Sequence, residues 1–299
     1  MEIVKKIQAD VIQFLFWVIS LLPLALLHGL GSIMGTVLYL FNNRNKHIGN
    51  VNLSICFPTL SAKQHRQLLK KSLKENAKTM LETFWLWKNS KKALSRNIGE
   101  IKNQHILMRA KDSEKGTIFI TPHFGSWEFV GLLTAKYCDL WILYAPSKSI
   151  HIDRLSRIGR TSTGATLIST TNLNLKNLIR HLKSGGCVGI LPDQVPEGKG
   201  GEYANFFHRR AYTSTLACKL AQAIKCHVVI GYGLRNPKNP RIYDSYYFEA
   251  PEIILDENLI NAVTGINQCI EKYILSSPEN YIWGYKRFKK PAPGDTNPY

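Results

Sequence analysis

The amino-terminal part of the sequence lacks charge. No Asp, Glu, Lys or Arg occurs between residues 11 and 43 of the 299-residue chain. A membrane-spanning helix needs roughly 20 apolar residues; residues 11–27 fall slightly short, and three glycines interrupt residues 28–41. No A-x-A cleavage site of a secretory signal is present. We therefore predict a membrane anchor over residues 1–43, either one tilted helix or a shallow helix pair. The alternative is a buried pair of core helices.

The cysteines lack the spacing of a metal site or of a redox motif. None of the six forms a CxxC pair, and none has a histidine at metal-ligand spacing. We expect reduced, buried thiols, no disulfide, no metal and no cofactor. The sequence also lacks a helix-turn-helix, a zinc module and an RNA-binding signature. The net charge of +18 therefore points to anionic partners other than nucleic acid, such as phospholipid, a phosphorylated substrate or an acidic protein.

Residues 44–299 alternate between apolar runs typical of strands and stretches with helical periodicity. This alternation predicts one catalytic domain with an α/β fold, in which helices flank a mixed central sheet. The predicted strands cover residues 116–121, 140–146, 165–169, 187–192, 227–234 and 245–250. The predicted helices cover residues 61–88, with Ser61 as N-cap, and residues 126–137, 150–161, 173–184, 212–224 and 256–276.

One segment, "TPHFGSWE", places His123 five residues before Glu128. On a regular helix such residues differ by about 140° around the axis and cannot share a face. The preceding strand is expected to end at Thr121, however, and Ser126 can cap the following helix. Glu128 would then lie in the first helical turn, from which a side chain can reach back to the preceding loop. The spacing thus allows a histidine held by a carboxylate at the carboxyl end of a strand, where open α/β sheets bind ligands.

Such a pair suits general-base catalysis. If Glu128 accepts a hydrogen bond from Nδ1 of His123, the tautomer is fixed and Nε2 can take a proton from an alcohol. The sequence has no G-x-S-x-G nucleophile elbow, so direct attack by a substrate hydroxyl fits better than an acyl-enzyme. The alternative is a histidine and a glutamate that lie near each other without a shared role.

The "TPHFGSWE" block resembles the active-site block of the bacterial late acyltransferases of lipid A biosynthesis, a lauroyl/myristoyl transferase family within the wider His-x4-Asp/Glu glycerolipid acyltransferases. The resemblance continues in order along essentially the whole chain. It covers "NLSICFP" (52–58), "RLSRIGRTSTGATLI" (154–168), "GILPDQVPEGKGG" (189–201), "FFHRRAYTSTLACKLA" (206–221) and "PENYIWGYKRFKKP" (278–291). The chain departs from the family at Ala145, usually Arg, at His208, usually Gly, and at Tyr285, often His.

The resemblance implies a glycerolipid acyltransferase-like fold and a membrane-associated enzyme at the bacterial inner membrane, with its catalytic domain on the cytoplasmic side. It implies transfer of a fatty acyl group from acyl carrier protein to a hydroxyl of a lipid A precursor. Three alternatives stay open. The acceptor can be another glycolipid or an aminolipid, the donor can be acyl-CoA, or the chain is a basic membrane-binding protein without catalytic activity.

The resemblance also implies roles for particular residues. His123 and Glu128 form the catalytic pair, and Arg160 is the candidate to stabilise the oxyanion, unless it contacts a phosphate or forms a structural ion pair. Asp193 holds Arg160 or positions the acceptor, unless it caps a turn. Substrate binding is assigned to polar and basic residues that can meet lipid phosphates or acyl carrier protein, namely Gln194, Arg209, Arg210 and Arg287.

Overall fold

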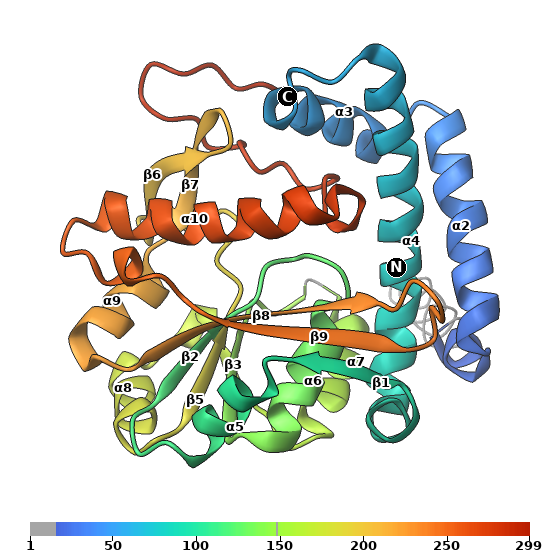
Figure 1. The fold of residues 1–299 in the computed structure, drawn as a ribbon. Helices are drawn as coiled ribbons and strands as arrows, with labels where there is room; N and C mark the ends of the chain where they lie inside the picture. The colour runs from blue at the N-terminus through green and yellow to red at the C-terminus, as the bar shows by residue number, and fades with distance from the viewer. Residues whose placement is uncertain (1–15, 148) are drawn as a thin grey trace, which may run out of the picture.

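The computed structural model describes residues 16–147 and 149–299 and has a mixed α/β architecture (Figure 1). Among the described residues, seven strands form one sheet in the order β1-β9-β8-β2-β5-β3-β4. Neighbouring strands are parallel except β8 and β9, which are antiparallel. Their bounds are β1 Ile98–Lys102, β2 Thr117–Ile120, β3 Leu140–Tyr144, β4 Thr166–Ser169, β5 Cys187–Ile190, β8 His227–Arg235 and β9 Tyr243–Glu249. The predicted α/β class with a mixed sheet is confirmed.

The central strands are buried on both faces. Every residue of β2 ("TIFI") and of β5 ("CVGI") is buried, as the continuous apolar runs of a parallel sheet require. The six predicted strands correspond to β2, β3, β4, β5, β8 and β9. The edge strand β1 was not predicted, because its sequence "IGEIK" is half-exposed and carries only two apolar residues.

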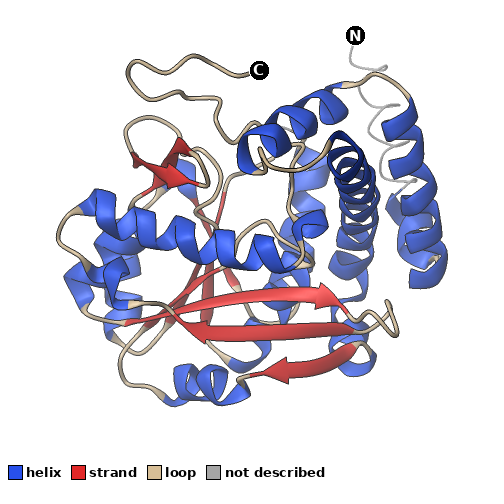
Figure 2. Ribbon diagram, turned by 45° about the horizontal axis from the view of Figure 1, so that its top comes forward, coloured by secondary structure: helices blue, strands red, loops and turns tan. Residues whose placement is uncertain are grey.

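Helices cover both faces of the sheet (Figure 2). Helices α5, α6 and α7 lie on one face, and α8, α9 and α10 lie on the other. Their bounds are α5 Gln104–Asp112, α6 Trp127–Tyr137, α7 Ile150–Thr161, α8 Leu175–Lys183, α9 Leu216–Ile224 and α10 Leu259–Ser276, with short 3-10 turns at Thr170–Asn172, Glu252–Leu255 and Pro278–Asn280. Each connection between parallel strands is thus a helical crossover, which places the loops after the strands at one edge of the sheet.

The predicted helix over residues 212–224 is wrong at its start. Strands β6 (Gly201–Phe206) and β7 (Arg209–Ser214) form a two-stranded antiparallel hairpin, and α9 begins only at Leu216. The side chains of β7 pair with those of β6, and Ala204, Phe206 and Ala211 point into the core. Cross-strand pairing of this kind overrides the helical periodicity of the segment.

Helix α2 (Leu24–Leu40) packs along the long helix α4 (Ala62–Arg96), which begins at Ser61 with the predicted side-chain cap. The two helix backbones approach closely, since a Cβ at Gly35 would lie 2.4 Å from Cα of Lys74. Helix α3 (Arg44–Cys56) follows at an angle of 80°.

No single helix among the described residues is long and apolar enough to cross a membrane, although the bent pair of α2 and α3 meets the test by length and composition. The first part of the predicted anchor, residues 1–15, lies outside the described residues.

A buried polar network connects α2 to the sheet. His28 Nε2 lies 2.9 Å from Glu82 on α4, and Arg235 on β8 contacts both Glu82 and Glu75 at 2.8 Å. Tyr243 donates to the same Glu82 carboxylate. Burial alone would raise the pKa of Glu82, but Arg235 and His28 outweigh it and lower this pKa to about 2. The carboxylate therefore stays ionised inside the protein and connects α2, α4, β8 and β9.

Candidate active site

The topology brings His123 and Asp193 together. Strands β2 and β5 are parallel neighbours with Ile120 opposite Ile190, and each residue of the pair follows its strand by three positions. Asp193 is fully buried and accepts two hydrogen bonds from His123, one from the backbone N–H at 2.9 Å and one from ring Nδ1 at 2.8 Å. Burial raises the pKa of Asp193, but the contacts with His123 outweigh it and lower this pKa. Because an ionised carboxylate only accepts hydrogen bonds, Nδ1 carries the proton.

The predicted partner of His123 was therefore wrong. Glu128 does lie in the first turn of α6, as expected, but its carboxylate is turned away from Nδ1. It accepts hydrogen bonds from Trp87 Nε1 at 2.9 Å and from Arg160 Nε at 3.0 Å, and a further one from Arg160 Nη2. Burial raises the pKa of Glu128, while Arg160 and Trp87 outweigh it and lower this pKa. Ser126 precedes the helix without capping it; its backbone N–H donates to Gly233 instead.

Close packing between α7 and α4 positions the arginine. A Cβ at Gly159 would lie 2.3 Å from Cβ of Trp87, so only glycine allows this approach. The guanidinium of the next residue, Arg160, then lies over the Trp87 ring at 5.6 Å from its centroid. Its Nε and Nη2 are bound by Glu128, while Nη1 has no hydrogen-bond partner among the described residues. The Nη1 amino group of this half-buried cation is thus available to a ligand.

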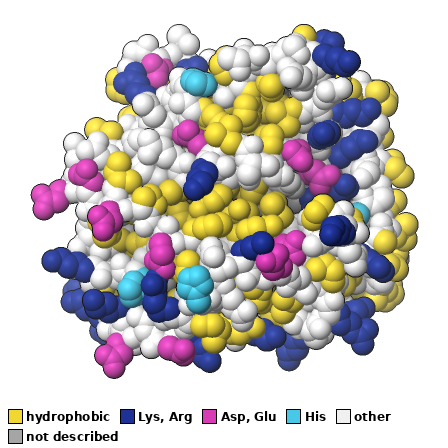
Figure 3. All heavy atoms as spheres, in the orientation of Figure 1, with side chains coloured by type: hydrophobic (Ala, Val, Ile, Leu, Met, Phe, Trp, Pro, Cys, Tyr) yellow, Lys and Arg dark blue, Asp and Glu magenta, His cyan; other side chains and the backbone are white. Residues whose placement is uncertain are grey.

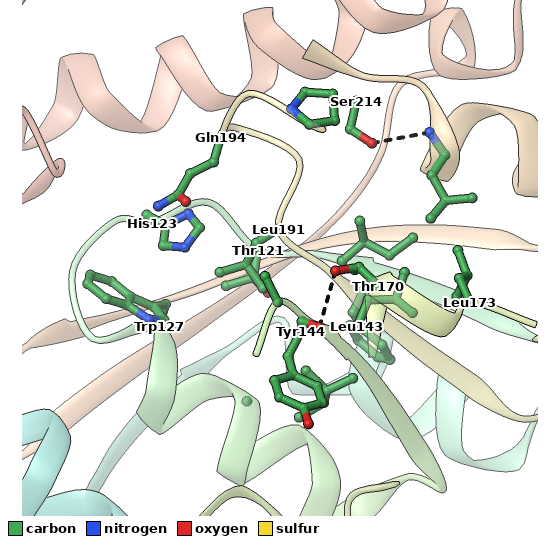
Figure 4. A pocket seen from close by; sticks show the side chains of 18 of the residues that line it. Thr121, His123, Trp127, Leu143, Tyr144, Thr170, Leu173, Leu191, Gln194 and Ser214 are labelled. Atoms are coloured by element: carbon green, nitrogen blue, oxygen red, sulfur yellow. Dashed lines mark hydrogen bonds between the residues drawn. The ribbon is translucent and has the colours of Figure 1, made fainter. Parts of the chain in front are cut away.

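The His123 ring lies at one end of a large cavity. The cavity has a volume of about 800 Å³ and is lined by His123, Trp127, Glu128, Arg160 and Gln194, among others. Figure 4 shows the His123 ring between the Gln194 side chain and the Trp127 indole, and the indole meets the ring edge to face at 5.4 Å. Nε2 of His123 has no hydrogen-bond partner within the described part of the chain, so it is available to accept a proton.

Away from His123 the cavity is largely apolar. Its walls come from the ends of the central strands and from α6, α8 and α9, and many are aliphatic, including Leu132, Ile142, Leu143, Leu173, Ile190, Leu191 and Leu216. A long hydrocarbon chain suits such walls, since burying each CH2 group contributes roughly 0.8 kcal/mol.

Three residues that were predicted to bind substrate lie elsewhere. Arg287 is only 2% exposed and donates to Tyr212 and Thr213 of the hairpin. Arg209 and Arg210 bind the carboxyl-terminal segment through the carbonyl of residue 296 and the carboxylate of Asp295. In this structure the three arginines hold the hairpin and the chain end in place. Of the predicted binding residues, Gln194 lines the cavity.

A metal ion has no obvious place in the part of the chain that the structure describes. Residues 16–147 and 149–299 contain no group of three or more His, Cys, Asp or Glu side chains that could hold one. All six cysteines are free thiols, five of them buried.

Comparison with known proteins agrees with this arrangement. The family described as "Bacterial lipid A biosynthesis acyltransferase" matches residues 6–290. The chain belongs to this family. It is 26% identical to the lipid A biosynthesis palmitoleoyltransferase of Escherichia coli over 95% of this chain and 91% of that protein. The lauroyltransferase of the same organism is 23% identical over 95% and 92%, and a lipid A biosynthesis acyltransferase of Haemophilus influenzae is 25% identical over 78% and 72%. The protein is therefore an acyltransferase.

The sequence did contain a signal for the true partner of His123. The segments "ITPH" and "ILPD" both end a buried strand and continue with one residue, a proline and a polar side chain. Two adjacent parallel strands with the same ending place their polar residues at the same level. The repeated ending thus indicates a pair of His123 and Asp193, provided that β2 and β5 are neighbours.

Proposed function

We propose that this acyltransferase moves a fatty acyl group from the thioester of acyl carrier protein to a hydroxyl group of a lipid A precursor, with His123 as general base. One observation carries the proposal. Asp193 accepts a hydrogen bond from the protonated Nδ1 of His123, and the other ring nitrogen, Nε2, faces a large, mostly apolar cavity. A neutral imidazole in this tautomer is suited to take a proton from an alcohol.

The reaction follows from this geometry. The acceptor hydroxyl gives its proton to Nε2 of His123 while its oxygen attacks the thioester carbonyl carbon, so an O–C bond forms and the carbonyl becomes an oxyanion. Asp193 stabilises the resulting imidazolium, because its ionised carboxylate lies 2.8 Å from Nδ1. When the tetrahedral intermediate collapses, the C–S bond breaks and the leaving thiolate recovers the proton from Nε2.

Arg160 is placed to stabilise the oxyanion. Its free Nη1 is the donor that the intermediate needs, and a charged donor in a water-poor site contributes strongly to transition-state stabilisation. Glu128 acts through Arg160 as a positioning residue. Its carboxylate binds Nε and Nη2 and fixes the plane of the guanidinium.

The acceptor is proposed from the relatives, whose names specify lipid A biosynthesis. Acyl carrier protein is the proposed donor, and acyl-CoA is the alternative because both present the same thioester. Either donor is cytoplasmic, so the catalytic domain is assigned to the cytoplasmic side of the inner membrane. Another glycolipid or an aminolipid is the alternative acceptor.

The test is a transfer assay with purified protein. Acyl carrier protein or CoA carrying the same fatty acid is offered with a lipid A precursor, and mass spectrometry detects the product. His123→Ala should lose roughly 10²–10⁴-fold in rate, the usual contribution of a positioned general base. His105→Ala on the exposed face of α5 is the control. If His123→Ala keeps more than a tenth of wild-type turnover, His123 is not the base.

We also propose that the outer face of α2 lies in the membrane surface. Its inner face packs on α4, but Leu30, Ile33 and Leu40 are exposed, Leu40 at 67% and Ile33 at 64%. Figure 3 shows hydrophobic side chains along the edge formed by α2, beside lysine and arginine side chains over α4. Exposed cations on α4 include Lys63, Arg66, Lys70 and Lys71. An apolar strip flanked by cations is typical of helices that lie in an anionic interface.

Vesicle sedimentation tests this placement. The double variant Ile33→Glu and Leu40→Glu should bind vesicles of anionic phospholipid at least about tenfold more weakly. Each substitution removes an aliphatic group that would insert into the lipid and adds a negative charge that the anionic lipid repels. Its melting temperature should be unchanged, since both side chains are exposed. Ile260→Glu replaces a residue of α10 that is 50% exposed and is the control. Equal binding by all three proteins would exclude α2 as the contact face.

A further inference from the structure

The cavity divides at the central sheet. Side chains alternate between the two faces of a strand, and the lining residues of β3 fall on both faces. Leu140, Ile142 and Tyr144 point to the α6 side, whereas Leu143 and Ala145 point to the α8 and α9 side. His123 lies on the loop beyond the strand ends (Figure 4).

The branch on the α6 side reaches deep into the protein. Its walls include Gly131 of α6, Gly189 of β5 and Ile142 of β3, and it ends near Leu140 and Phe119. A Cβ added at Gly131 would have no atom within 4 Å. One added at Gly189 would lie in ordinary van der Waals contact with Ile142 and Leu140 at 3.7 Å and with the carbonyl oxygen of Trp141 at 4.0 Å. Gly131 therefore leaves open space beside an otherwise packed layer, and Gly189 admits a side chain that would reach into that space.

The length of this branch can be estimated from β3. In depth along β3, the cavity runs from the level of the exposed residue Ala145 at its mouth to the buried residue Leu140, which is five residue steps or about 16 Å at about 3.3 Å per residue. An extended chain of tetrahedral atoms advances about 1.2 Å per bond, because an extended peptide spans about 3.3–3.6 Å for every three bonds. The branch therefore holds about 12–14 carbons in an extended conformation.

Arg160, the group that would contact the carbonyl of the donor, lies at the upper end of the same branch. Arg160 and Glu128 line the cavity above Gly131, and Gly131 follows Glu128 by one turn of α6. An acyl chain that enters here has its carbonyl beside Arg160 and its tail below Gly131. The opposite branch is bounded by the exposed residues Leu175 and Lys219, so part of its wall reaches solvent.

We propose that the α6-side branch holds the acyl chain of the thioester donor and that Gly131 and Gly189 set the length of the chain that is transferred. This inference rests on the proposed function, because it takes Arg160 as the contact of the donor carbonyl. Gly131 follows Glu128 by three residues of α6 and therefore lies about 4.5 Å deeper, because a helix rises about 1.5 Å per residue. Gly189 lies opposite Ile142, three residue steps or about 10 Å below Ala145. A side chain at either position then blocks the branch at a different depth.

The experiment compares donors of 8 and 14 carbons on acyl carrier protein. In Gly189→Val the ratio of kcat/KM for the 14-carbon donor to that for the 8-carbon donor should fall at least about tenfold, because the block lies about 8 carbons down. In Gly131→Leu the block lies above both chain ends, so kcat/KM should fall at least about tenfold for both donors. Both substitutions are favourable for their secondary structure, and melting curves check that the variants fold.

The outcomes separate this inference from the proposed function. A wild-type protein that transfers neither chain would refute the function itself. A wild type that transfers both, with a Gly189→Val variant whose ratio is unchanged, would refute the role of this branch alone. Equal losses for both donors in Gly189→Val would also refute it, since a merely structural defect does not depend on chain length.

Discussion

Replacing Asp193 with asparagine tests the hydrogen-bond pattern at the active site with almost no change in shape. Asp193 accepts from the backbone N–H of His123 through Oδ2 and from ring Nδ1 through Oδ1. Asparagine has only one accepting oxygen. If that oxygen keeps the backbone contact, the amide NH2 faces Nδ1, which must then accept. The proton moves to Nε2, and the nitrogen that faces the substrate can no longer act as a base.

The expected loss follows from that change of tautomer. An asparagine in place of the carboxylate that orients a catalytic histidine lowers kcat by about 10⁴-fold in a serine protease, where the geometry is kept and the tautomer is wrong. We expect a loss of about 10³–10⁴-fold for Asp193→Asn. Asp193→Ala leaves the tautomer free and should be no more damaging than Asp193→Asn, although it removes more atoms.

The assay is single-turnover transfer from acyl carrier protein to the lipid acceptor in detergent micelles, with nitrogen NMR of the labelled imidazole as a second measurement. The NMR spectrum should report a proton on Nδ1 in the wild type and on Nε2 in Asp193→Asn. If Asp193→Asn keeps more than a tenth of the wild-type rate, or if Asp193→Ala is clearly the worse variant, the assigned role of Asp193 is wrong.

Five further variants test other parts of the structure. Gly35→Leu should separate α2 from α4 and lower the melting temperature, because its Cβ would lie 2.4 Å from a backbone atom. Arg235→Met should lower the free energy of unfolding, measured with denaturant, by about 3–5 kcal/mol, since it leaves Glu82 buried without its cation. Because the pKa of Glu82 is lower in the folded protein than its unfolded value of 4.5, the ionised carboxylate stabilises the fold fully above pH 4.5, and this stabilisation is lost as the pH falls through about 2. Glu82→Gln should make the free energy of unfolding depend less on pH in that acidic range. Arg160→Met should destabilise the fold, and adding Glu128→Leu should restore stability but not activity.

The central sheet could be predicted because its strands are continuous apolar runs that alternate with helices along the chain. Strands β2 and β5 are buried along their whole length, and the short length of these apolar runs and the Gly and Pro residues that flank them favour strands over helices. The hairpin β6–β7 could not be predicted in the same way. It contains Arg209 and Arg210, and its stability depends on Arg287, which lies about 80 residues further along the chain and is buried beneath it. Long-range contacts of this kind leave no local pattern.

The active site was predicted in its residues but not in its pairs. His123, Glu128 and Arg160 line one cavity, and Asp193 is bound to His123 directly behind it. Glu128 appeared to be the partner because it is close in the sequence, whereas the true partner is 70 positions away. The order of strands in the sheet decides which loop ends meet, and the order β2-β5-β3 is a property of the whole fold. Motif spacing alone therefore identifies the catalytic groups and leaves their connections open.

The sequence paired Glu128 with His123 and Asp193 with Arg160 or the acceptor, whereas in the structure Asp193 binds His123 and Glu128 binds Arg160. If both carboxylates faced His123, Arg160 would have no buried anion, and two like charges would share one site, which raises one pKa. Instead each carboxylate has its own cation or proton donor, and the pKa values of both Asp193 and Glu128 are lowered. During the reaction Asp193 stabilises the positive imidazolium, while Glu128 keeps Arg160 directed at the negative oxyanion. The two charges that develop in the transition state are thus stabilised by separate, preorganised groups.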